Sequence, residues 1–291
     1  MRKFLTTILL AVAVVASQPV EAAKPPEAYA ASTPWNLDYS DDSCALRRTF
    51  VHADKMVLFE LRQFQPGDYF TMTVGSKHFP SGASPKIRFV PDPKPHEVIS
   101  GVPLIYPHGL VGFVWGDSFM PMTKVDSLLT SVAEDDKLRE SRETAIKGIE
   151  LSGSISPPII LTVGEMNRPM DGMRKCMDEL LTHWGIDAAT QRTLTRTAKP
   201  LVQGRWASII QAEYPSAMLN QMKGGIVRVR MIVGPDGRAQ SCHIQVPSQD
   251  PSFEKTACAG MMKASRFEPA LDAAGKPTVS YFATSIIYRV N

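Results

Sequence analysis

The clearest alternation of apolar and polar residues in this chain lies between positions 226 and 233. Every second residue there is apolar, and Arg228 and Arg230 stand between them, which is the period-two pattern of a half-buried strand. The next residues, Pro235-Asp236-Gly237, include a glycine that can supply the positive φ of a hairpin turn. We therefore predict a hairpin whose return strand covers 240–246. The apolar face of its first strand consists of Val227, Val229, Met231 and Val233.

Two helices and a third strand complete the predicted C-terminal region. A short helix is predicted over 216–222, directly after Tyr214-Pro215. Beyond the hairpin, apolar residues recur at helical spacing from Phe253 onward, and Pro269 ends that helix because it disfavours helical dihedrals at the residue before it. The long run 278–290 is predicted as the last strand.

This order of elements, with five short motifs at these places, resembles the C-terminal domain of TonB. Each motif is weak alone, and their order and spacing carry the resemblance, which covers residues 212–291 and no more of the chain. The motifs are Tyr214-Pro215 before the first helix, Gly224-Gly225 followed by alternating Val and Arg, the Asp236-Gly237 hairpin, Phe267-Glu268-Pro269-Ala270 after the second helix, and Gly275-Lys276-Pro277 before the last strand.

The resemblance implies an α+β fold for 212–291, with an antiparallel three-stranded sheet in the order helix, strand, strand, helix, strand. It also implies a periplasmic domain that binds a short segment of an outer-membrane transporter, or another envelope protein, by adding a strand to an exposed sheet edge. The alternatives are that the same residues close a core, or pair with a second copy in a structural envelope protein. The last strand is the candidate edge, and the residues expected at the contact are Tyr214, Pro215, Ser280, Phe282, Thr284, Ile286 and Tyr288.

The first 22 residues have the layout of a secretory signal peptide. Arg2-Lys3 is a short basic region, residues 4–16 are apolar, and cleavage is expected after Ala22 or Ala23. The apolar run is short for a membrane span, so we expect export to the periplasm, with an uncleaved inner-membrane anchor as the alternative. A complete TonB has a membrane helix and a long Pro-rich spacer instead. We therefore do not expect energy transduction in the usual manner.

The middle of the chain has room for one further domain. Residues 23–34 are rich in Ala and Pro and are predicted as a flexible lead, 35–186 as a β-rich domain of unknown function closed by helices, and 187–211 as a partly helical linker. Inside that domain we predict a hairpin of 56–61 and 70–74, strands at 86–90, 109–115 and 158–163, an exposed helix over 134–150 and an amphipathic helix over 170–184.

The charge balance excludes some classes of partner. The whole chain carries a net charge of +3, and removal of residues 1–22 takes away Arg2, Lys3 and Glu21, a net +1, which leaves +2. So mild a charge favours neither nucleic acid nor a strong attraction to a membrane surface. We expect a protein partner and no cofactor.

The four cysteines are predicted to form two disulfides, because an exported chain enters an oxidising compartment. Cys242 lies on the core face of a strand and Cys258 in the helix predicted to cover it. Cys44 and Cys176 would tie the start of the first domain to its closing helix. The two bridges would stabilise the fold by about 3 and about 5 kcal/mol on the chain-entropy model. A zinc site is the rival interpretation, but the spacing offers no Cys-x-x-Cys and no paired His.

No catalytic residues are expected. Gly116-Asp117-Ser118 is similar to the Gly-Asp-Ser block of some secreted esterases, so a secreted hydrolase is a distant alternative. Those enzymes also need a His and a carboxylate, which their family supplies from an Asp-x-x-His block that this sequence lacks. The histidines are scattered, and we interpret each as a surface or helix-end residue: His52, His78, His96, His108, His183 and His243.

Overall fold

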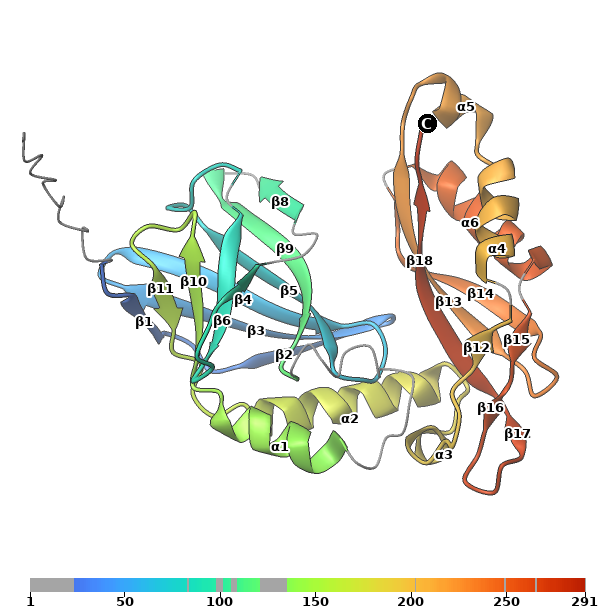
Figure 1. Ribbon diagram of the computed structural model, residues 1–291, viewed down its shortest axis with the longest axis horizontal. Helices are drawn as coiled ribbons and strands as arrows, with labels where there is room; N and C mark the ends of the chain where they lie inside the picture. Colours follow the sequence, from blue (N-terminus) through green and yellow to red (C-terminus); the bar gives the residue numbers. More distant parts are fainter. Residues whose placement is uncertain are drawn as a thin grey trace, which may run out of the picture.

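The computed structural model describes residues 24–290 apart from 83, 98–101, 106–108, 121–134, 202, 249 and 265. The signal-peptide prediction lies outside these residues. The described chain forms two units, a large curved β-sheet with helices along one side and a smaller sheet with helices packed on one face (Figure 1). The α+β fold class predicted from the sequence is confirmed.

The N-terminal sheet has eleven strands, arranged as a half-barrel. Its order is β7-β6-β10-β11-β1-β3-β4-β5-β9-β8, with β2 paired to β3. All neighbours are antiparallel except β1 and β11. The strands are β1 (Glu27–Ala31), β2 (Asn36–Ser40), β3 (Ser43–His52), β4 (Lys55–Gln63), β5 (Tyr69–Ser76), β6 (Pro85–Val90), β7 (His96–Glu97), β8 (Val102–Ile105), β9 (Val111–Ser118), β10 (Gly148–Gly153) and β11 (Ile159–Leu161).

Alternating side chains of these strands form one apolar core. Phe50, Phe59 and Met72 are fully inaccessible to solvent, and α2 (Asn167–His183) packs its buried side chains against this core. α1 (Asp135–Ala145) lies beside α2 along the same side of the sheet (Figure 1). The hairpin, the strands near 86–90, 109–115 and 158–163, and the amphipathic helix are all confirmed.

Two predictions for this domain are wrong. The Ala/Pro-rich lead is ordered from Glu27 onward, because β1 fits between β11 and β3 and buries Tyr29. The helix predicted over 134–150 ends at Ala145, and its last residues start β10 instead. Ile149 is fully buried between β6 and β11, so burial in the sheet outweighs the helical charge pattern there.

The smaller sheet contains the predicted hairpin and last strand, in the order β14-β13-β18 and antiparallel throughout. Its core is built from alternate residues of β13 together with Phe253 and Ala257. Gly225 lies so close to the Phe253 ring that an added Cβ would be 2.7 Å from it. Glycine there allows the first strand to pass beneath the helix. The elements are α5 (Ser216–Asn220), β13 (Gly225–Val233), β14 (Ala239–Val246), α6 (Pro251–Ala264) and β18 (Ser280–Tyr288).

The segment predicted as a linker belongs largely to the C-terminal core. After α3 (Ala188–Arg192), the chain contributes Leu194 and Ala198 to that core, and Trp206 and Ile210 of α4 (Gln203–Ala212) are buried in it against α6. Short pairs brace the same end of the domain: β12 (Lys199–Pro200) with β15 (Phe267–Glu268), and β16 (Ala270–Leu271) with β17 (Pro277–Thr278).

Both predicted disulfides are present. Cys44 at the start of β3 is bonded to Cys176 in α2, with the Cα atoms 6.2 Å apart, and Cys242 in β14 is bonded to Cys258 in α6, with the Cα atoms 5.5 Å apart. Each bridge joins a sheet to the helix that covers it, as the sequence analysis expected.

Candidate partner-binding site

The last strand, β18, is an edge of the C-terminal sheet. It pairs in unbroken register with β13, from Ser280 opposite Val233 to Tyr288 opposite Gly225. No strand pairs with its other side among the described residues. An edge strand presents unpaired N–H and C=O groups that can template a further strand. The position of β18 therefore agrees with the expectation from the sequence.

Two glutamine side chains show which residues of β18 turn their backbone outward. Gln191 Nε2 donates to the carbonyl oxygen of Val279 (3.0 Å), and Gln211 Nε2 donates to that of Ile287 (2.7 Å). In an antiparallel strand the N–H and C=O of one residue point to the same side, and successive residues alternate. Residues 281, 283 and 285 therefore face outward with 279 and 287. The alternation directs these backbone groups away from β13, and no other strand of the described residues lies on that side of β18.

The residues of β18 predicted at the contact lie on the other set of positions. Ser280, Ile286 and Tyr288 are at most 8% exposed, and Phe282 packs against Trp206 and Phe267. Their side chains, with that of Thr284, face the core side of the sheet, and their backbone groups point toward β13. Burial, with Glu213 and Tyr214 nearby, raises the pKa of Tyr288 to about 12.

Tyr214 and Pro215 lie at the far end of the same strand. The Tyr214 ring meets the rings of Phe253 and Tyr288 edge-on, with centroids 5.7 and 5.4 Å away, and its hydroxyl donates to the carbonyl of Lys223 (2.5 Å). Tyr214 thus braces the end of β18, and Pro215 is the residue that precedes α5.

The outer face of the C-terminal sheet rests on the N-terminal domain. Asp42, in the turn between β2 and β3, accepts from Arg230 of β13 (2.9 Å) and contacts His243 of β14 (3.0 Å). The Arg230 guanidinium lies 3.8 Å from the ring centroid of Trp184, whose Nε1 donates to the carbonyl of Asp41 (3.3 Å). Burial lowers the pKa of Arg230, and Asp42 opposes that shift.

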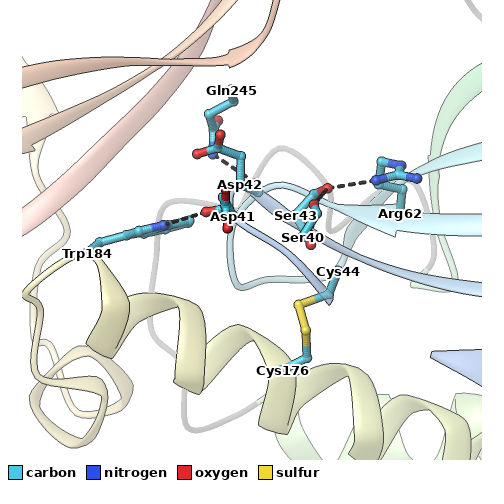
Figure 2. The surroundings of a disulfide bond; sticks show 9 residues. All are labelled: Ser40, Asp41, Asp42, Ser43, Cys44, Arg62, Cys176, Trp184 and Gln245. Carbon is cyan, nitrogen blue, oxygen red and sulfur yellow. Dashed lines mark hydrogen bonds between the residues drawn. A yellow bond between two sulfur atoms is a disulfide. The ribbon is translucent and has the colours of Figure 1, made fainter. Parts of the chain in front are cut away.

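Figure 2 shows how the Cys44–Cys176 disulfide supports this contact from below. Cys44 lies two residues after Asp42, and Cys176 lies in the helix that ends beside Trp184. The bridge thus joins the two elements that reach the C-terminal sheet. From the other side, Gln245 Nε2 donates to the carbonyl of Phe64 (2.7 Å).

A shallow cleft of about 430 Å³ opens beside this contact. Polar groups of the β2–β3 turn and Arg62 form one wall, and the end of β14 from Gln245 to Pro247 forms the other. Arg62 is held by Glu60 and by the Ser43 hydroxyl, so its charge is already compensated.

The N-terminal domain does bring one of the scattered histidines to a carboxylate. His96 Nε2 lies 2.7 Å from Asp117 Oδ2, and this hydrogen bond raises the pKa of His96. Ser118 is 4% exposed, and its hydroxyl accepts from the backbone N–H of Met120 (3.0 Å). No hydrogen bond joins Ser118 to His96 in the described chain. The sequence interpretation of His96 as a surface or helix-end residue did not include this contact, and the His96 side chain is 29% exposed.

Two further features are absent from the described residues. No group of three or more His, Cys, Asp or Glu side chains there could hold a metal ion. None of the helices in that part of the chain is long and apolar enough to cross a lipid bilayer.

These features define a small α+β domain with an open strand edge, seated on a larger β-domain. Comparison with protein families shows what the smaller domain is similar to: residues 210–290 match the family described as Gram-negative bacterial TonB protein C-terminal. The resemblance expected over 212–291 is confirmed. Domains of this family mediate protein–protein interaction in the envelope and are not enzymes. A search of curated proteins returned no match to the chain.

Sequence reasoning missed the outward backbone positions Tyr281, Ala283 and Ser285, and the glutamines at either end of them. Hydrophobic alternation reports which side chains face the core. It does not report which backbone groups face a neighbouring strand, because that depends on where the neighbour lies. These positions could have been identified only by knowing which strand lies next to β18.

Proposed function

We propose that this protein is a periplasmic envelope protein whose C-terminal domain binds an extended segment of an outer-membrane transporter along β18. The observation that carries the proposal is the open backbone of residues 281, 283 and 285 between the two glutamine contacts. In such a mode main-chain pairing supplies affinity, and side chains beside the strand supply selectivity.

The surroundings of β18 support a bound strand of limited length. Tyr281 packs edge-on against Trp184, with ring centroids 6.0 Å apart, and Gln191 of α3 also bonds the Ser280 hydroxyl (2.7 Å). The N-terminal domain and α3 therefore flank one end of the edge, and Gln211 of α4 flanks the other. A segment of about five to seven residues fits between them at the usual rise of a strand.

The test is a titration of the purified chain from Lys24 onward with peptides from the N-terminal regions of outer-membrane transporters. Backbone amide shifts in NMR should concentrate at Tyr281, Ala283 and Ser285. Association of two protein copies through the same residues, with no peptide perturbing them, would contradict the proposal and favour the structural, self-associating alternative.

A further inference from the structure

Arg228 of β13 carries a charge that nothing in the described chain pairs. Its guanidinium makes no hydrogen bond or ion pair there, its Nε is shielded from solvent, and its Cζ lies 4.7 Å from the ring centroid of Phe64. Burial lowers the pKa of Arg228, with Tyr69 as a weaker opposing influence. Its neighbour Arg230, by contrast, meets Asp42. Polar groups shielded in this way normally have partners, so the exception calls for one.

Arg228 lies on β13, directly beside the open edge strand β18. It is on the outer face of the sheet, and its register partner on β18 is Ser285, one of the residues whose backbone faces outward. The next pair along the same face is Ile226 and Ile287, which are 60% and 43% exposed. The surface beside β18 thus carries the unpaired charge of Arg228 and, next to it, the exposed apolar pair Ile226 and Ile287.

We propose that Arg228 recognises a carboxylate carried by the extended segment that binds along β18. This inference rests on the proposed function and specifies its partner. Adjacent strands are about 4.8 Å apart, so a residue opposite Ser285 would lie about 10 Å from the backbone of β13. Ser285, the residue of β18 paired with Arg228, has a small side chain, and an Arg and a Glu side chain together span that distance.

The proposal therefore fixes two positions of the partner segment. It has an acidic residue opposite Ser285 and, two positions along on the same face, an apolar residue opposite Ile287. Phe64 and Tyr69 shield the ion pair in part, so it is worth more than an exposed pair. We expect about a tenfold gain in affinity over an uncharged residue.

The experiment uses a defined set of peptide probes on the purified chain from Lys24 onward. The probes are acetylated and amidated seven-residue peptides of alternating Thr and Val, with one Glu moved through every position, and matched peptides with Gln in its place. Dissociation constants are measured by NMR titration at low and moderate salt. At one position the Glu peptide should bind about tenfold more tightly than its Gln counterpart, and added salt should reduce the difference.

Variants of the protein test whether Arg228 causes the preference for Glu peptides. Arg228→Gln should abolish the difference in affinity between Glu and Gln peptides. Since the change removes an unpaired, desolvated charge, the variant should keep its melting temperature, and Arg228→Lys, which keeps the charge, should retain part of the preference. The matched control is Arg238→Gln, which removes the same charge from a side chain that is 72% exposed on the hairpin turn and should change nothing.

The outcomes separate this inference from the proposed function. Equal binding of Glu and Gln peptides to the wild-type protein, or a preference that survives in Arg228→Gln, overturns the role of Arg228 while strand addition stands. Failure of every peptide to perturb β18 overturns both.

Discussion

At the scale of single residues, one aspartate, Asp42, forms the ion contacts between the two domains. Asp42 pairs with both Arg230 and His243, whereas the adjacent Asp41 uses only its backbone carbonyl, toward Trp184. The Arg230 side chain is 8% exposed, so it depends on that carboxylate to offset its desolvation.

We expect Asp42→Asn to lower the free energy of unfolding by about 2 kcal/mol, because a buried guanidinium loses its charged partner. Chemical denaturation followed by tryptophan fluorescence, to which Trp184 contributes with the other tryptophans, is the measurement. Asp41→Asn is the matched control and should be neutral. Equal effects of the two changes would show that the Asp42 contact does not hold the domains.

His96 makes the stability of the N-terminal domain depend on pH. Its hydrogen bond to Asp117 raises its pKa in the folded state. The protonated form is therefore favoured by folding, and its contribution is complete below the unfolded pKa of about 6.5 and is lost as pH rises through the folded pKa. The melting temperature should fall between pH 6 and pH 8. His96→Asn should flatten that dependence and His78→Asn should preserve it; a slope unchanged in the first variant would refute the assignment.

At the scale of elements, β18 combines two roles on alternate residues. One set of side chains builds the core, and the backbone of the other set remains open. The sequence predicts the strand and its buried side chains, but the candidate contact residues chosen from it are the core-facing set.

Proline substitution tests this division. Ser285→Pro deletes an outward N–H, so it should leave the fold intact and weaken peptide binding by about tenfold or more, since edge positions tolerate proline. Thr284→Pro deletes an N–H that faces β13 opposite Val229, and it should destabilise the domain instead. Thermal unfolding and peptide titration of both variants distinguish the effects. The reverse pattern would mean that the strand presents its other residues.

At the scale of the whole molecule, two disulfides hold the two sheets to their helices. The Cys242–Cys258 bridge closes a separation of 16 residues across a small domain. Replacement of both cysteines by Ser should lower the free energy of unfolding of that domain by about 2–5 kcal/mol, measured by denaturant titration. Reduction of the wild-type protein breaks both bridges and should lower the free energy of unfolding at least as much, and no loss at all in the double variant would contradict the prediction.

Export is the second prediction at this scale. We expect cleavage after Ala22 or Ala23, because a short apolar run precedes a small-residue site. Mass spectrometry of the protein purified from its native envelope should find a mature N-terminus at Ala23 or Lys24. A chain that retains Met1 in the membrane fraction would establish the anchored alternative.

The sequence by itself determined the order of elements in the C-terminal domain, the resemblance to TonB and both disulfides. These follow from local patterns: alternation, turn glycines, helical spacing and two cysteine pairs within separate domains. Only the tertiary structure decided that Asp42 meets Arg230, 188 residues away, that residues 27–31 join a sheet, and that Arg228 is left unpaired beside the open edge. The physical reason is that local pattern reports which side chains seek burial, whereas strand neighbours, backbone direction and ion pairs depend on which distant segments are brought together.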